Sequence, residues 1–127
     1  MVKCYAKGAR AERELIKAFS GKGFSVIRAA GSGVSGACPD LLAFKRGMHY
    51  AFECKSWSAS SLAVKKNQFK ELLGWEDNTG ITTFIAWKIG GEGWRFVKLS
   101  EMNEAGKHFT VTESRALLID RKLEDLF

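Results

Sequence analysis

Apolar and polar residues follow one another along this chain with periods that predict both helices and strands. Apolar residues recur at helical spacing, every three or four positions, in residues 9–21, 62–75 and 113–127. Short apolar runs between turn-forming residues predict strands over residues 24–30, 41–44, 50–55, 81–89 and 93–99. This order predicts an α/β fold in which helices flank a central mixed β-sheet of about five strands. No repeat or linker is visible, so we expect residues 1–127 to form a single domain.

A polar break at residues 46–47 predicts a two-residue hairpin loop, and such a loop sets the register of the two strands that it joins. In that register Phe44 faces His49 and Asp40 faces Glu53. Directly opposite residues have Cβ atoms roughly 4.5–5.5 Å apart, and like charges at that spacing destabilise a sheet. A divalent cation such as Mg²⁺ would compensate, because it prefers carboxylate oxygens. The alternative is a surface hairpin whose ends carry ordinary solvated charges.

A cation is expected beside these two acids. Lys55 lies two positions after Glu53, so a strand places both side chains on one face. Cys54 then points into the opposite layer, which is an ordinary place for a reduced cysteine. A Glu-x-Lys triplet is common by chance, so its value as a signal depends on the predicted pairing with Asp40.

A further acid lies on the apolar side of the first predicted helix. At about 100° per residue, Glu12 falls in the middle of the stripe formed by Leu15, Ile16 and Phe19, whereas Glu14 falls on the polar side. A carboxylate on a buried face needs a partner or a function, so we expect Glu12 to point toward the same site. The alternative is that Glu12 caps the helix or interacts favourably with the helix dipole.

The distribution of charge indicates a polyanionic partner. The net charge is +6, and residues 1–28 contain seven Lys or Arg against two Glu. Residues 101–127 instead contain four basic residues against six acidic ones. A positive field concentrated in the first two-thirds of the chain favours nucleic acid. The alternative is a charge that serves only solubility.

Composition excludes several other classes of protein. With 127 residues, 46% of them hydrophobic, the chain can bury a core. No apolar run approaches the ~20 residues of a membrane span, so we expect no membrane partner. The N-terminal residues lack the apolar segment of a signal peptide. The three cysteines are an odd number without metal-binding spacing, which suits a reducing cytoplasm, or a host cytoplasm if the source is viral.

The acids and the lysine resemble the PD-(D/E)xK nuclease superfamily, and more closely the archaeal-type Holliday junction resolvases called Hjc. The resemblance is carried by the segments KGARAERELIKAFSGKGFSVIRAAGSG, CPDLLAF with YAFECK, and AWK with GWRF. The superfamily motif alone is weak, whereas KGxxxERELI followed by RxAGSG is more specific. The resemblance covers about the first 100 residues, and residues 101–127 carry no family signal.

This resemblance implies a restriction-endonuclease-like nuclease fold and a homodimer that resolves four-way DNA junctions. It implies paired, Mg²⁺-dependent hydrolysis of phosphodiester bonds, with Mn²⁺ as a substitute. The family's catalytic positions fall on Glu12, Asp40, Glu53 and Lys55, and a functional serine falls on Ser32 or Ser35. The implied metal ligands are Glu12, Asp40, Glu53 and the main-chain carbonyl of Cys54.

The residues expected to bind DNA or a second subunit form two further sets. Phosphate contacts are expected from Lys7, Arg10, Arg13, Arg28, Lys65 and Lys66. The alternative for Lys65 and Lys66 is a solvated helix face. Because the twofold geometry of a junction needs two facing sites, a dimer interface is expected at Leu72, Leu73 and Trp75. The alternative for Trp75 is the core of the monomer.

Two rival functions stay open. Another PD-(D/E)xK endonuclease, of restriction or repair type, would prefer linear or damaged duplex. A non-catalytic DNA-binding module would lack one of Asp40, Glu53 or Lys55, and all three are present. The sequence also leaves open whether Lys55 orients the attacking water, deprotonates it, or stabilises the charge of the phosphorane.

Overall fold

The computed structural model describes residues 2–29, 38–56 and 59–127, with side chains from Ala9 onward. Ser32, Ser35 and the side chain of Lys7 lie outside this described part. The helices are α1 (Val2–Ser20), α2 (Lys66–Thr79) and α3 (Glu113–Ile119), with 3₁₀ turns η1 (Leu99–Glu101) and η2 (Leu123–Leu126). The strands are β1 (Ser25–Arg28), β2 (Leu41–Lys45), β3 (Met48–Ser56), β4 (Ser61–Lys65), β5 (Thr82–Ile89), β6 (Gly93–Lys98), β7 (Asn103–Ala105) and β8 (His108–Thr112).

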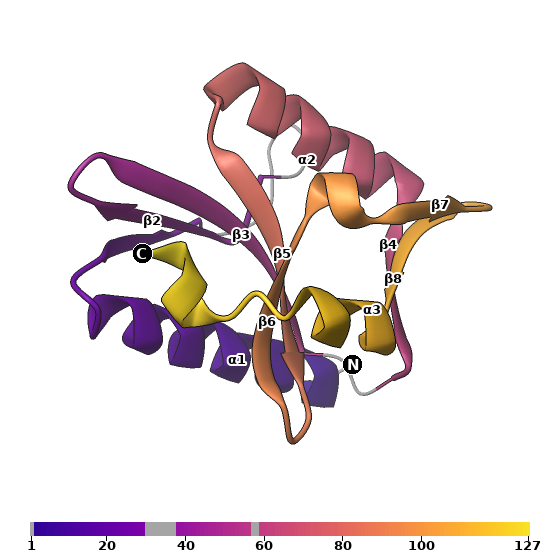
Figure 1. Ribbon diagram of the computed structural model, residues 1–127, viewed down its shortest axis with the longest axis horizontal. Helices are drawn as coiled ribbons and strands as arrows, with labels where there is room; N and C mark the ends of the chain where they lie inside the picture. Colours follow the sequence, from indigo (N-terminus) through magenta and orange to yellow (C-terminus); the bar gives the residue numbers. More distant parts are fainter. Residues whose placement is uncertain (1, 30–37, 57–58) are drawn as a thin grey trace.

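Five of the described strands form a central sheet in the order β1-β2-β3-β5-β6. Strands β3 and β5 run parallel, whereas the other neighbouring pairs are antiparallel. The sheet is therefore mixed, as the sequence predicts. Helix α1 packs on one face of it, and α2 lies on the other side (Figure 1).

Strand β5 lies in the middle of this layered structure and is buried on both faces. Phe84 and Ala86 join a cluster with Phe19 of α1, whereas Ile85 and Trp87 join the cluster beneath α2. Successive side chains of a strand point to opposite faces, so the middle of a strand that is covered on both sides is mostly apolar, as it is from Phe84 to Trp87. The unbroken apolar run in this part of the sequence has that cause.

The prediction of a helix over residues 62–75 is wrong at its beginning, where the chain forms strand β4. This strand belongs to a second sheet, which has the order β4-β8-β7 among the described strands. Leu62 and Val64 are buried and Ala63 between them is less so, which is the period of a strand. Leu62 lies opposite Val111 of β8, and this tertiary pairing overrides the local preference for helix.

The predicted C-terminal helix over residues 113–127 is also wrong in length. Helix α3 ends at Ile119 and is capped by Asp120, whose φ of 53° lies in the left-handed region. The carbonyl of Arg121 then accepts a hydrogen bond from the N–H of Phe96 at 3.0 Å. The guanidinium of Arg121 donates to both carboxylate oxygens of Glu101, at 2.7 and 2.9 Å. These bonds hold the segment after α3 against β6, so it cannot continue the helix.

Helix α1 is longer than predicted. It begins at Val2, well before residue 9, because the apolar stripe that signals the helix covers only its later turns. No helix in the described part of the chain is both long enough and apolar enough to cross a membrane.

Replacing either of two glycines at α2 by alanine should change the free energy of unfolding, in opposite directions. Gly80 ends the helix with a φ of 71°, and Gly74 lies inside it, while a Cβ at either position meets nothing within 4 Å. Gly80→Ala should therefore lower the free energy of unfolding by about 1 kcal/mol, from backbone strain alone. Gly74→Ala should raise it by about 1 kcal/mol. Chemical denaturation of both variants checks this, and equal effects would contradict the assigned end of α2.

Candidate active site

A tight hairpin joins β2 to β3 and has the predicted register. Arg46 and Gly47 have φ angles of 47° and 86°. Positive φ at both central residues is typical of a type I′ turn, whose twist matches that of the paired strands. Phe44 lies opposite His49, so the register derived from the sequence is confirmed.

Asp40 lies one position beyond the last partners of this ladder, Leu41 and Phe52. Its N–H donates to the carbonyl of Phe52 at 2.8 Å. Its carboxylate Oδ2 accepts a hydrogen bond from the N–H of Cys54 at 2.9 Å. The regular ladder thus ends one step short of the predicted pairing with Glu53, but the Cys54 contact ties the Asp40 carboxylate to the same stretch of β3.

Glu53 is the more enclosed of the two acids, with 6% of its surface exposed. Its Oε2 accepts a hydrogen bond from Nε2 of Gln68 at 3.0 Å. The Nζ atom of Lys55 lies 3.7 Å from the same oxygen, so Glu53 and Lys55 share a face of β3, as predicted. The site therefore joins β3 to the first turn of α2.

Sequence reasoning misses Gln68. One feature of the sequence could have identified it: Gln68 lies directly before Phe69 and one turn before Leu72, which are buried positions of α2. A polar side chain next to such positions is half-buried and needs a partner. That signal could not be used, because the predicted helix began four residues too early and its inner face could not be related to Glu53.

Burial raises the pKa values of both acids. Desolvation raises the pKa of Glu53 to about 7, with the charge of Asp40 adding to the effect and Lys55 opposing it. Burial also raises the pKa of Asp40, while the hydrogen bond from Cys54 lowers it and the charge of Glu12 raises it further. Near neutral pH the two carboxyls thus tend to hold a proton, which neutralises part of their charge. A cation placed between the two acids would neutralise this charge instead.

Cys54 contributes its backbone to the site and its side chain to the core. The thiol packs with the cluster on the α1 side, in the layer opposite Glu53, as predicted. Burial raises the pKa of this thiol well above its usual value. A strand residue presents its N–H and its carbonyl to the same edge, so the carbonyl of Cys54 lies on the edge that Asp40 occupies.

Glu12 reaches the same end of the sheet from α1. It shares the inner side of the helix with Leu15 and Phe19, which are fully buried, and its own side chain is 19% exposed. Its Oε1 accepts a hydrogen bond from Nε of Arg28 at 2.8 Å. Glu14, on the polar side, binds Nζ of Lys88 at 2.7 Å instead. The predicted orientation of the two glutamates is therefore confirmed.

Asp40 and Glu53 form a two-carboxylate site. Among the residues whose side chains are described, no three His, Cys, Asp or Glu lie close enough together to hold one ion. Mg²⁺ is commonly bound by one or two carboxylates, and it keeps several waters for the remaining positions. Glu53 is buried and Asp40 is half-buried, and the raised pKa values of both show that the protein alone stabilises their negative charge poorly. The donor set fits a divalent cation that prefers oxygen.

Comparison with known proteins identifies the family. The family model described as archaeal Holliday junction resolvase (Hjc) matches residues 3–127. This chain belongs to that family. The crossover junction endodeoxyribonuclease Hjc of Archaeoglobus fulgidus is 32% identical over 110 residues, which cover 86% of this chain and 81% of the relative. The enzyme of the same name from Methanocaldococcus jannaschii is 34% identical over 118 residues, covering 91% and 84%.

Solved structures agree with this family. The structure of Hjc from Archaeoglobus fulgidus matches with a TM-score of 0.79 at 28% identity, covering 88% of each chain. A bacterial homing endonuclease matches with a TM-score of 0.54 at 16% identity, over 84% of this chain and 73% of that one, which is a likeness of fold alone. The predicted nuclease fold is confirmed. The Hjc family match also extends through residues 101–127, where the sequence reading found no signal.

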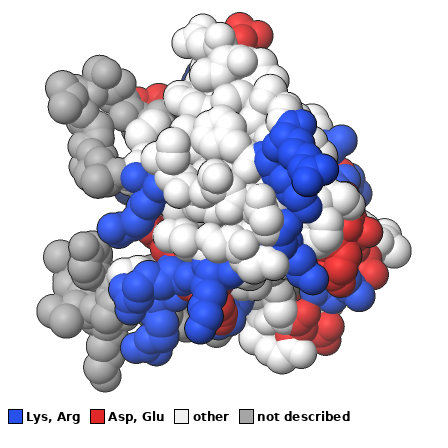
Figure 2. Space-filling view, turned by 90° about the vertical axis from the view of Figure 1, so that its left-hand side faces the viewer, with Lys and Arg blue, Asp and Glu red and all other residues white. Residues whose placement is uncertain are grey.

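The basic residues predicted to bind DNA differ in their surroundings in this Hjc-family chain. Arg10 and Arg13 are exposed on α1, and Lys65 is exposed at the end of β4. Lys66 forms an ion pair with Glu104 of β7. Figure 2 shows lysine and arginine side chains gathered toward the lower left of one face, with a second group toward the upper right and acidic side chains at the right-hand edge. A polyanion approaching this face would meet positive charge.

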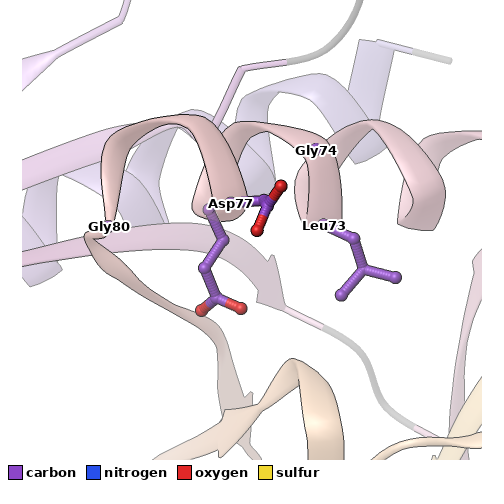
Figure 3. Close-up of a pocket in the computed structure, with 5 residues that line it drawn as sticks. Leu73, Gly74, Asp77 and Gly80 are labelled. Carbon is purple, nitrogen blue, oxygen red and sulfur yellow. The ribbon is translucent and has the colours of Figure 1, made fainter.

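The residues predicted for the dimer interface are only partly available. The prediction is wrong for Leu72, because this residue is fully buried in the core beneath α2 and cannot contact a second copy. Leu73 is 39% exposed, and Trp75 is half-buried. Figure 3 shows Leu73 beside Gly74 on α2, where they line a shallow hollow together with Asp77.

The raised pKa of Glu53 predicts how stability depends on pH in the presence of a chelator. A carboxyl whose pKa rises from about 4.5 to about 7 on folding stabilises the protein fully below pH 4.5, and this contribution is lost as pH rises through 7. We expect the free energy of unfolding to fall by about 3 kcal/mol between pH 5 and pH 8. Glu53→Gln should flatten this fall and should be the more stable protein at pH 8.

Denaturation curves at the two pH values check this prediction. Glu124→Gln, which changes an exposed acid, is the matched control and should keep the wild-type profile. Adding Mg²⁺ at pH 8 should stabilise the wild type but not Glu53→Gln. A wild-type protein that gains stability from pH 5 to pH 8 would contradict the burial of this charge.

Proposed function

We propose that this chain is a metal-dependent endonuclease that cuts four-way DNA junctions, with residues 1–127 acting as one nuclease domain. The observation that carries the proposal is the Asp40–Glu53 pair, in which Glu53 is buried and Asp40 is half-buried, with Lys55 beside it, in a chain of the Hjc family. The relatives named above are crossover junction endodeoxyribonucleases, which supports this substrate.

Asp40 and Glu53 would hold Mg²⁺, or Mn²⁺ in its place, together with the carbonyl of Cys54. The bound ion would supply Lewis acidity at the scissile phosphate and a more acidic water. Both carboxyls must be ionised to bind it, so metal binding should strengthen as pH rises through the pKa of Glu53 near 7. Glu12 is bound to Arg28, which favours a contact with the ion through water rather than a direct bond.

Lys55 would act on the water or on the phosphate. Its ammonium lies 3.7 Å from Oε2 of Glu53, so it is held at the site by charge and points along the same face. From there it can orient the attacking water, or take its proton, or neutralise the charge that develops on the phosphorane. All of these roles require the lysine to stay beside the acid.

Phosphate contacts would come from both sides of this site. Arg10, Arg13 and Lys65 are exposed and can meet the DNA directly. Arg28 and Lys66 would have to exchange their carboxylate partners for phosphates. We propose the same role for Lys7, and we propose Ser32 or Ser35 as the functional serine of the segment between β1 and β2. These contacts hold the backbone of DNA without reading its sequence.

A junction has two strands to cut, and a twofold dimer would face both of them with one site each. We place the dimer surface on α2, at Leu73 and Trp75, because an exposed leucine beside a half-buried tryptophan is stabilised by burial. The enzyme would work in the cytoplasm of the cell or of a viral host, because that is where its DNA substrate would lie.

The central experiment compares a four-way junction with linear duplex of the same sequence, in Mg²⁺ and in EDTA. Only the junction in Mg²⁺ should be cut, and Asp40→Asn should reduce cutting by about a thousandfold or more, because it removes a ligand charge. Binding to the junction should change little. Glu124→Gln, which changes an exposed acid outside α2, is the control and should cut normally.

Faster cutting of linear duplex would assign the chain to the restriction or repair type of nuclease. Normal Mg²⁺-dependent cutting by Asp40→Asn would contradict the metal assignment.

The dimer is tested by a pair of leucine substitutions. Leu73→Asp places a charge on the proposed interface and should convert the dimer to a monomer that nicks one strand without the paired second cut. Leu118→Asp on α3 is the control, since Leu118 is 82% exposed and lies away from α2. Light scattering gives the mass, and a dimer that survives Leu73→Asp would place the interface elsewhere.

A further inference from the structure

We propose that Gln68 is a positioning residue, which fixes the Glu53 carboxylate so that one chosen oxygen, Oε1, faces the divalent ion. This inference rests on the proposed metal-dependent function and adds a residue from α2 to that site. The observation is the hydrogen bond of 3.0 Å from Nε2 of Gln68 to Oε2 of Glu53.

Each of the two acids has one oxygen bound by a donor of the protein. Oδ2 of Asp40 accepts the backbone N–H of Cys54 at 2.9 Å, and Oε2 of Glu53 accepts the amide of Gln68. Within the described residues no other hydrogen bond to either carboxylate is found, apart from the ion pair of Lys55 with Oε2. Oδ1 of Asp40 and Oε1 of Glu53 are therefore the pair of oxygens left for an ion.

Glu53 needs such a partner more than Asp40 does. Its side chain has one more rotatable bond than that of aspartate, so it has more freedom to lose when it binds an ion. A neutral amide is suited to this task, because it donates a hydrogen bond without cancelling the negative charge that attracts the cation. Lys55 cannot replace it, since its ammonium competes electrostatically with the ion.

The position of Gln68 is fixed by the second sheet. Phe69, the next residue, is 3% exposed and stacks on Phe109 of β8 with ring centroids 3.9 Å apart. Leu72, one turn later, is fully buried in the same cluster. The start of α2 is therefore held against this cluster, and the amide of Gln68 is directed at Glu53 before any ion binds. The C-terminal third of the chain thus affects the active site indirectly, because Phe109 of β8 holds the turn of α2 that carries Gln68.

The test is the affinity for Mn²⁺ of the whole protein without DNA, measured by calorimetry, together with the Mg²⁺ concentration that gives half-maximal junction cleavage. Gln68→Met keeps the length of the side chain and removes the donor. Loss of a residue that orients a metal ligand typically weakens metal binding 10–100-fold. We expect a change of that size in both measurements, while saturating Mg²⁺ restores most of the cleavage rate and metal-free junction binding is unchanged.

Two further variants make the result interpretable. Gln68→Asn keeps the amide but withdraws it by one methylene group, and should show the same loss of affinity. Asn78→Ala removes an exposed carboxamide from the same helix and should behave as the wild type. A purely structural role for Gln68 would lower the melting temperature without changing the Mn²⁺ affinity, and that result would overturn the proposal.

The outcomes also separate this proposal from the proposed function. A wild-type protein that binds Mn²⁺ but cuts no junction would overturn the function and leave Gln68 to be judged by affinity alone. A wild-type protein that binds no divalent ion would overturn both. Unchanged Mn²⁺ affinity in Gln68→Met and Gln68→Asn, in a protein that cuts junctions, would overturn only the role of Gln68.

Discussion

Asp40 and Glu53 are held together, largely out of water, at the end of the ladder between β2 and β3. Burial alone raises the pKa of both, and the charge of Asp40 raises that of Glu53 further, to about 7. The protein supplies Lys55 and the amide of Gln68 to Glu53, and one backbone N–H to Asp40. These contacts fix the acids in place but do not neutralise them. The arrangement is therefore less stable alone than with a divalent ion, which is how a site can favour metal binding.

The layers of the fold bring the parts of this site together from distant segments. The parallel pair β3 and β5 is covered on both faces, so β3 can present Glu53 toward α2 while Cys54 packs toward α1. Helix α1 brings Glu12 to the same end of the sheet, where it accepts a hydrogen bond from Arg28 of β1. Helix α2, held by the second sheet, brings Gln68. The candidate active site is thus formed at one end of the central sheet, between α1 and α2.

Local signals in the sequence were sufficient for a large part of this structure. The two-residue loop set the register of β2 and β3, and the helical period put Glu12 on the inner side of α1. The parts that were missed depend on partners far away in the chain. The segment around Leu62 becomes a strand only because β8 lies opposite it, and Arg121 ends a helix because it binds Glu101 and β6.

The same cause explains the errors at the site. Leu72 was expected at an interface because a period alone cannot tell the core side of α2 from an exposed one, and tertiary packing buries it. Gln68 was missed because its role exists only once α2 is docked beside β3. The hairpin register and the strand and helix periods indicated the acids and the lysine, and the family resemblance agreed with them, but neither could indicate contacts that depend on this packing.

The most direct test of the account is a crystal of the protein grown with Mn²⁺, in which anomalous scattering locates the ion. The account predicts a peak between Asp40 and Glu53, at roughly 2.0–2.3 Å from one oxygen of each, with waters completing the coordination. Oδ2 of Asp40 and Oε2 of Glu53 should still bind Cys54 and Gln68. An empty site at saturating Mn²⁺, or an ion bound elsewhere while junctions are cut, would contradict the claim that Asp40 and Glu53 form the metal site.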